Sequence, residues 1–211
     1  MRVRSYAEAG AAAVSVLTEP TRFDGTMAHL ESAADVLRPL AVPAMRKDFL
    51  VDPYQVVEAR VAGAGGVLVI VRMLSRAQIR ELLDCAHLQG LFVLLEAFDR
   101  TDIEAVHEVL SLRDDMPRDP PVLAGLNCRD LMTLQIVPER LFELSSLLPD
   151  SLPRVAESGV LSAADAARVA EAGYQFALVG SALMQGHDPG GLAREMLDAG
   201  RRATSTQRAR S

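Results

Sequence analysis

The sequence of 211 residues lacks the features that mark several large classes of protein. No apolar run approaches the ~18 residues of a membrane span, and the first residues have no apolar signal-peptide core. Its two cysteines, Cys85 and Cys128, do not have the spacing of a disulfide framework or a zinc site, and its four histidines are scattered. We therefore expect no metal site, no membrane partner and a location in the reducing cytoplasm.

Two further absences narrow the function. No Gly-x-Gly-x-x-Gly follows the first apolar strand, which argues against a dinucleotide-binding fold. There is also no excess of positive charge: the net charge is −6, which disfavours nucleic acid as a partner. An anionic substrate would have to be held by local donors. The length and the 49% hydrophobic content predict a single domain, residues 1–200, followed by a disordered basic tail, residues 201–211.

Apolar strands alternate with helices at a spacing of roughly 25–30 residues, which is typical of parallel strand–helix–strand units. The predicted strands are 11–17, 43–46, 66–72, 91–95, 122–126, 153–156 and 176–179. The predicted helices are 1–10, 27–37, 53–63, 75–90, 99–110, 138–148, 162–173, 180–184 and 191–200, and residues 18–25 and 111–121 are predicted loops. The fold class is therefore α/β, of the TIM (β/α)8-barrel type.

A closed barrel of this type has eight strands, whereas this sequence contains seven and opens inside a helix. We therefore expect the barrel to lack its first strand–helix unit at the N-terminus. The strands near Val14 and Val179 would then each have an unpaired edge. Such edges favour self-association.

Four polar side chains fall at the C-terminal ends of predicted strands: Lys47, Glu96, Asn127 and Glu157. In a barrel these positions converge on one mouth, where such proteins keep their chemistry. An ammonium, carboxylates and an amide in one partly desolvated pocket are suited to general acid–base catalysis. We take these four residues as the candidate catalytic group.

A second group, Ser158, Gly159, Gly180 and Ser181, follows the last two predicted strands. In barrels the loops at these positions, with a short helix, commonly bind phosphate through backbone N–H groups. The group therefore predicts a phosphorylated small-molecule substrate.

Other charged and apolar residues also lie near these strand ends. Strand alternation points Arg46 and Asp48 away from Lys47 and favours ion pairs with neighbouring strands. Phe49 and Leu131 fit either an apolar wall for an aromatic ring or ordinary core packing, and Arg129 either a contact with a substrate anion or a surface position.

The stretch around Lys47 also carries a resemblance. Arg46 to Phe49, followed by Asp52 to Gln55 with its helix-capping pattern, is similar to the most recognisable motif of the indole-3-glycerol-phosphate synthase family. Further blocks that resemble the family, in the same order, are 15–18, 125–131, 157–159 and 179–184. The resemblance runs from about Ala7 to about Leu197.

This resemblance implies a barrel of the ribulose-phosphate-binding type. It also implies ring closure, decarboxylation and dehydration of a carboxyphenylamino-deoxyribulose phosphate to indole-3-glycerol phosphate, in tryptophan biosynthesis, with no cofactor. Lys47 resembles the general acid that protonates the substrate carbonyl, and Glu96 the carboxylate that partners it. Asn127 and Glu157 resemble residues that orient the substrate and stabilise charge.

The remaining residues resemble contacts to the rest of the substrate. Ser158, Gly159, Gly180 and Ser181 correspond to polar and phosphate-side contacts, and Arg129 to a contact with the anthranilate carboxylate. The chain departs from the family at its start. The glutamate, second lysine and serine-proline-serine loop of the family's first strand unit do not occur, and neither does the helix that caps the mouth.

Three interpretations stay open at this point. The chain is a synthase whose first residues are not in this sequence, or a non-catalytic barrel fragment that serves as an interaction module. The third interpretation is another phosphate-binding barrel enzyme, such as an aldolase that uses Lys47 as a desolvated nucleophile.

Overall fold

A computed structural model describes residues 2–112, 121–130 and 133–208 of the chain. Seven strands form one sheet in which every neighbouring pair is parallel and the spatial order is the chain order. The strands are β1 (Val14–Leu17), β2 (Ala44–Lys47), β3 (Gly66–Ile70), β4 (Phe92–Ala97), β5 (Val122–Asn127), β6 (Arg154–Glu157) and β7 (Phe176–Leu178). The predicted strand count and barrel type are confirmed.

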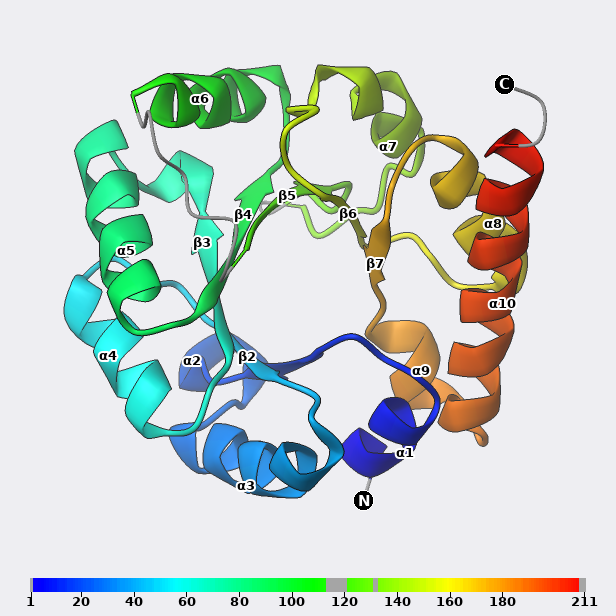
Figure 1. The fold of residues 1–211 in the computed structure, drawn as a ribbon, viewed down its shortest axis with the longest axis horizontal. Coiled ribbons are helices and arrows are strands. Elements are labelled where there is room, and N and C mark those ends of the chain that lie inside the picture. The colour runs from blue at the N-terminus through cyan, green and yellow to red at the C-terminus, as the bar shows by residue number, and fades with distance from the viewer. Residues whose placement is uncertain (1, 113–120, 131–132, 209–211) are drawn as a thin grey trace.

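Helices surround the curled sheet, as Figure 1 shows. The α-helices are α1 (Arg2–Glu8), α2 (Pro20–Phe23), α3 (Met27–Leu37), α4 (Pro53–Val61), α5 (Arg76–Leu88), α6 (Arg100–Ser111), α7 (Glu139–Glu143), α8 (Ala163–Glu171), α9 (Ser181–Gln185) and α10 (Pro189–Arg208). Three short 3₁₀ segments join them: η1 (Arg38–Leu40), η2 (Val71–Met73) and η3 (Ser145–Leu147). No helix among the described ranges is long and apolar enough to cross a membrane.

The core has two layers because both faces of the parallel strands are covered. All five residues of β3 are buried, and Val67 and Val69 pack outward against the surrounding helices. Leu68 of the same strand belongs to a second, smaller apolar cluster. Its members are Met45, Leu68, Ile70, Leu94, Phe98 and Val155. This second cluster lies beneath the strand ends that carry the candidate catalytic residues.

Local capping signals fix the starts of several helices. Asp52 accepts a hydrogen bond from the backbone of α4 while Gln55 reaches back, and Ser75 and Ser162 form the same kind of capping box on α5 and α8. Gly173, two residues after the end of α8, has a φ of 92°, a conformation that glycine adopts without steric cost. These features agree with the sequence patterns.

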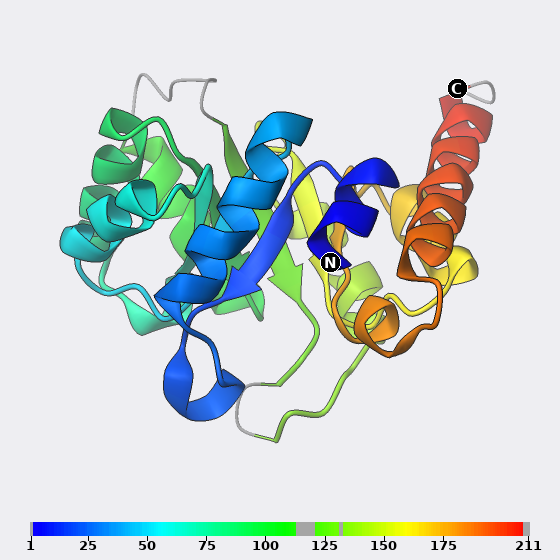
Figure 2. The ribbon, with the colours of Figure 1, turned by 90° about the horizontal axis from the view of Figure 1, so that it is seen from below.

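The first and last strands have no partner on their outer sides among the described residues. β1 pairs only with β2, and β7 only with β6. Phe176, at the start of β7, is 41% exposed. Outside this opening, α1 packs against α9 and α10, and Arg2 and Tyr6 contact Met184, so helices still cover part of the gap (Figures 1 and 2). The expectation of two unpaired strand edges is confirmed.

Three segments differ from the sequence-based expectation. The polar loop after β1 contains the short helix α2, capped by the side chain of Glu19. The helix expected after Pro138 is broken into α7 and η3. Residues 201–211 were expected to form a disordered tail after a helix that ends at Gly200. Instead α10 continues through Gly200 to Arg208, and residues 209–211 lie outside the described residues.

Candidate active site

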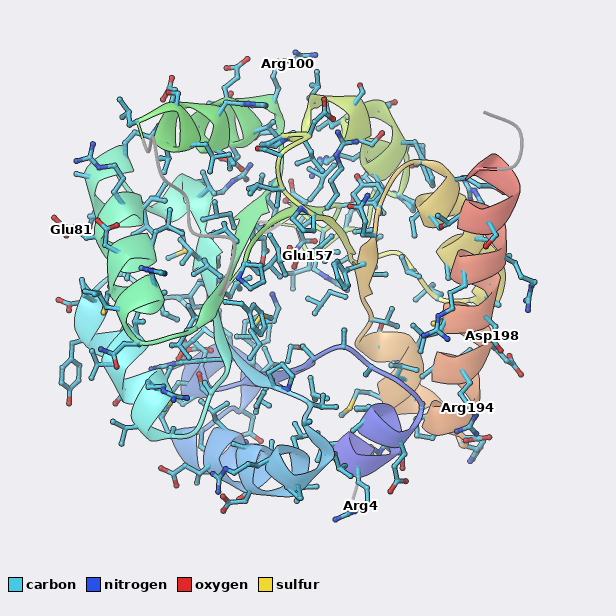
Figure 3. The ribbon with its side chains drawn as sticks, in the orientation of Figure 1. Arg4, Glu81, Arg100, Glu157, Arg194 and Asp198 are labelled. Carbon is cyan, nitrogen blue, oxygen red and sulfur yellow. The ribbon has the colours of Figure 1, made fainter. Side chains whose placement is uncertain are left out.

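The four candidate catalytic residues converge at the C-terminal end of the sheet. Lys47 ends β2, Glu96 lies one residue before the end of β4, Asn127 ends β5 and Glu157 ends β6. Figure 3 shows Glu157 near the centre of the ring of strands. Because the strands are parallel and in register, these four side chains enter the same mouth, as the sequence predicted.

Lys47 joins the two carboxylates. Its Nζ lies 3.1 Å from Glu96 Oε2 and 3.9 Å from Glu157 Oε2. The side chain of Lys47 is 24% exposed, whereas those of the glutamates are 2% and 1% exposed. Burial disfavours the ammonium, but the two carboxylates outweigh that cost, so the pKa of Lys47 is raised and the side chain stays protonated at neutral pH.

Asn127 fixes the orientation of Glu96. Its Nδ2 donates to Glu96 Oε1 at 2.7 Å, and its Oδ1 accepts from the backbone N–H of Arg129 at 2.9 Å. One carboxylate oxygen of Glu96 therefore accepts a hydrogen bond from the Asn127 amide, and the other accepts one from the Lys47 ammonium. This arrangement leaves little rotational freedom to the Lys47–Glu96 pair.

Glu157 is the most deeply buried polar residue of the group. Neither of its carboxyl oxygens has a hydrogen-bond partner within the described part of the chain. Burial and the nearby Glu96 charge raise the pKa of Glu157 well above its usual range, although the Lys47 charge acts in the opposite direction. Its side chain fits only because Gly125 has none: a Cβ there would lie 2.1 Å from Glu157 Oε1.

The predicted phosphate-side residues follow β6 and β7, which are neighbours in the sheet. Ser158 and Gly159 turn the chain away from β6 with φ values of 66° and 71°. Gly180 precedes α9, and Ser181 is the first residue of that helix. The two loops therefore lie at the same end of adjacent strands, beside Glu157.

The remaining candidates line the periphery. The ring of Phe49 packs against that of Phe23 from α2, with 6.3 Å between the ring centroids. The guanidinium of Arg129 donates to the carbonyl of Leu134 at 3.2 Å, within the loop after β5. Leu131 lies outside the described residues.

Two features of the site were not anticipated from the sequence. Lys47 is the only lysine in the chain, a signal that was present in the composition. The role of Gly125 depends on the position of a side chain on the next strand, which no local pattern reveals. Among the described residues, no cluster of His, Cys, Asp or Glu is arranged to hold a metal ion.

The fold places the chain among the TIM-barrel-type α/β proteins. It superimposes on 3-hexulose-6-phosphate synthase from Salmonella typhimurium with a TM-score of 0.69 at 15% identity, over 90% of this chain and 87% of that one. Orotidine 5'-phosphate decarboxylase from Pyrococcus horikoshii gives a TM-score of 0.66 at 16% identity, over 95% and 91%. At such identities the likeness concerns the fold alone.

Sequence comparison identifies the family. The model described as indole-3-glycerol phosphate synthase matches residues 2–196. Proteins named indole-3-glycerol phosphate synthase are 42% identical over 193 residues in a Nocardioides species and 40% over 195 residues in a Parafrankia species. These matches cover 92% of this chain and 69% and 68% of the two relatives. The chain belongs to the indole-3-glycerol phosphate synthase family, a family of lyases, and neither alternative interpretation is favoured.

Proposed function

We propose that this chain acts as a carboxy-lyase that converts carboxyphenylamino-deoxyribulose phosphate into indole-3-glycerol phosphate, CO2 and water, without a metal or organic cofactor. The observation that carries this proposal is the Lys47–Glu96 pair, held at the barrel mouth beside Asn127 and Glu157, in a chain of this family. The two free cysteines, Cys85 and Cys128, fit a reducing cytoplasm.

Lys47 is the proton donor for ring closure. In that step the anthranilate ring carbon that bears the carboxylate bonds to the ketone carbon, and the ketone oxygen takes a proton from Nζ. Because the carboxylate of Glu96, 3.1 Å from Nζ, holds Lys47 as an ammonium, the donor is charged before the substrate reacts. CO2 then departs, and its bonding electrons restore the aromatic ring.

The last step removes one molecule of water, made of the new hydroxyl group and a hydrogen from the adjacent carbon of the new five-membered ring, which yields the indole. Lys47 must regain its proton during this sequence. Glu157 is a second acid 3.9 Å from Nζ, and its raised pKa favours the protonated form. Glu96, fixed by Asn127, accepts a hydrogen bond from Lys47 and keeps Nζ directed into the mouth.

The other contacts orient the substrate. The backbone N–H groups around Ser158 with Gly159, and around Gly180 with Ser181, are proposed to bind the phosphate. Phe49 is proposed to contact the anthranilate ring; its pairing with another aromatic ring supports an apolar wall there.

Arg129 and Leu131 complete the proposed substrate contacts. Arg129 is proposed to contact the anthranilate carboxylate. Its backbone N–H donates to Asn127 Oδ1, so the residue lies beside the candidate catalytic group, which supports this role. Leu131 stays a sequence-based proposal for the apolar wall.

Fluorescence of the indole product measures this function directly. The purified 211-residue chain is expected to form indole-3-glycerol phosphate, and Lys47→Ala is expected to lower kcat at least ~100-fold, as for a lost general acid. The matched control is Arg154→Lys: Arg154 contacts Leu148 and Asp150 at the opposite end of the sheet, so its variant should retain turnover. Near-wild-type turnover in Lys47→Ala would refute the assigned role.

We also propose that the chain self-associates through the unpaired edges of β1 and β7. Backbone N–H and C=O groups on an open strand edge are templates for another strand, and Phe176 adds exposed apolar surface there. Light scattering at increasing protein concentration tests this proposal. A monodisperse monomer with one cooperative unfolding transition would contradict it.

A further inference from the structure

The strand end that carries Lys47 is held by a buried cluster on its opposite side. Arg46 points away from the mouth, and its side chain is only 5% exposed. Its Nη1 donates to Glu58 Oε2 at 2.7 Å and to the carbonyl of Gln55 at 2.9 Å, both on α4. Its Nη2 donates to Asp48 Oδ2 at 3.0 Å, and its Nε lies 3.3 Å from both that oxygen and Thr18 Oγ1.

The expectation that Arg46 forms ion pairs away from Lys47 is confirmed, but its charged partners differ from those expected. They are Asp48, on the same chain segment, and Glu58 of α4, rather than residues of neighbouring strands. In the described part of the chain, the only contact from the side of β1 is the hydroxyl of Thr18, the residue that follows this strand. The cluster therefore joins three parts of the structure at one guanidinium.

The same residues restrain the backbone on both sides of Lys47. Thr18 donates its N–H to the carbonyl of Lys47 at 3.3 Å and its hydroxyl to Asp48 Oδ2 at 2.7 Å. Asp48 Oδ1 in turn accepts from the N–H of Phe49 at 2.8 Å. The residues before and after Lys47 are thus bonded to one another and to the end of β1.

We propose that Arg46, together with Asp48 and Thr18, is a positioning residue that sets the direction of the Lys47 side chain toward Glu96. It acts through the backbone and does not touch the substrate. The inference rests on the proposed role of Lys47 as proton donor. Within the described chain β1 has no strand on its outer side, and this cluster connects the residue after β1 to the end of β2 by side-chain hydrogen bonds.

The planar fork of arginine is essential to this arrangement. A lysine at position 46 would keep the charge but supply a single ammonium in place of donors that reach three directions. The strand end would then shift, and a displacement of about 1 Å at a catalytic group costs on the order of 100-fold in rate. Arg46→Lys therefore separates geometry from charge.

The test uses two variants and one control. Arg46→Lys removes the fork, and Thr18→Val removes only the bridging hydroxyl while keeping the shape of the side chain. Arg154→Lys, at the opposite end of the sheet, is the control for loss of a partly buried arginine. Turnover is measured as kcat and KM. Because Lys47 is the only lysine, NMR of lysine-labelled wild type and Thr18→Val also gives a single side-chain signal to follow with pH. Arg46→Lys and Arg154→Lys each add one lysine, and its signal is assigned by comparison with the same variant that also carries Lys47→Arg.

Arg46→Lys is expected to lower kcat ~10- to ~100-fold with little change in KM, and Thr18→Val to lower it several-fold. In both variants the Lys47 signal should shift and its pKa should fall toward the ordinary lysine value, because Nζ moves away from the carboxylates. Arg154→Lys should change neither readout.

An unchanged Lys47 signal and an unchanged Lys47 pKa in a folded Arg46→Lys protein would overturn the inference. If Arg46→Lys does not fold, the same result in Thr18→Val would overturn it. Absence of turnover in the wild type would refute the proposed function instead. The NMR comparison would still decide whether Arg46 positions Lys47.

Discussion

Gly125 gives a direct way to disturb Glu157 without changing any polar group. Gly125 lies on β5, and a Cβ at this position would be 2.1 Å from Glu157 Oε1 and 2.9 Å from Leu94 Cδ1. Glu157 is fully buried, and its carboxyl group occupies the place that a side chain at position 125 would take. In Gly125→Ala we therefore expect the carboxyl group to be displaced from Lys47.

The magnitude follows from two effects. Overpacking by one methyl group in a well-packed region costs ~1–3 kcal/mol of stability. Closing a 2.1 Å contact to an ordinary van der Waals distance moves the carboxyl group by more than 1 Å. A displacement on that scale is expected to lower kcat ~100-fold, which corresponds to about 2.7 kcal/mol in activation free energy.

Gly66→Ala is the matched control. Gly66 begins β3, at the end of the sheet away from the mouth, and a Cβ there would lie 2.4 Å from the ring of Phe92. It introduces the same methyl group and a comparable clash without touching Glu157. Denaturant unfolding should show similar losses of stability in both variants, whereas kcat should fall only in Gly125→Ala. Wild-type kcat in Gly125→Ala, or an equal loss in Gly66→Ala, would refute the reasoning.

Three other variants test separate contacts. Glu157→Gln removes a charge that raises the pKa of Lys47, so the alkaline limb of the kcat–pH profile should move to lower pH; an unmoved limb would contradict the coupling. In the wild type the folded state favours protonated Glu157, so the free energy of unfolding should fall as the pH rises through the raised pKa of this residue. Glu157→Gln should abolish that fall. Asn127→Leu removes the donor to Glu96 and should lower kcat at least ~10-fold, since a hydrogen bond to a charged group contributes ~1.5–3 kcal/mol. Tyr174→Phe removes a buried hydrogen bond to α7 and should lower the free energy of unfolding by ~1 kcal/mol with kcat unchanged.

Features that depend on local chemistry were predictable from the sequence. The helix starts at Asp52 and Ser75 follow from capping residues, and the parallel sheet follows from apolar runs separated by helices. The meeting of Lys47 with Glu96 needed only the rule that parallel strands end at one mouth.

Features that depend on distant partners were not predictable. α2 forms in a polar segment because the Glu19 side chain caps it, and the helix after Pro138 breaks at Leu144. The environment of Glu157 likewise depends on the absence of a side chain at Gly125, on another strand. Sequence periodicity reports which face of an element is apolar, but it does not report which side chain lies opposite on the next element.

The neighbour-by-neighbour order of the sheet also bears on how the chain folds. Each strand pairs only with the strands that precede and follow it along the chain, and β1 does not pair with β7. Every strand pairing therefore closes a loop of one strand–helix unit, and the entropic cost of loop closure grows with loop length. This chain can build its sheet one unit at a time from any starting pair, without a search between its first and last strands.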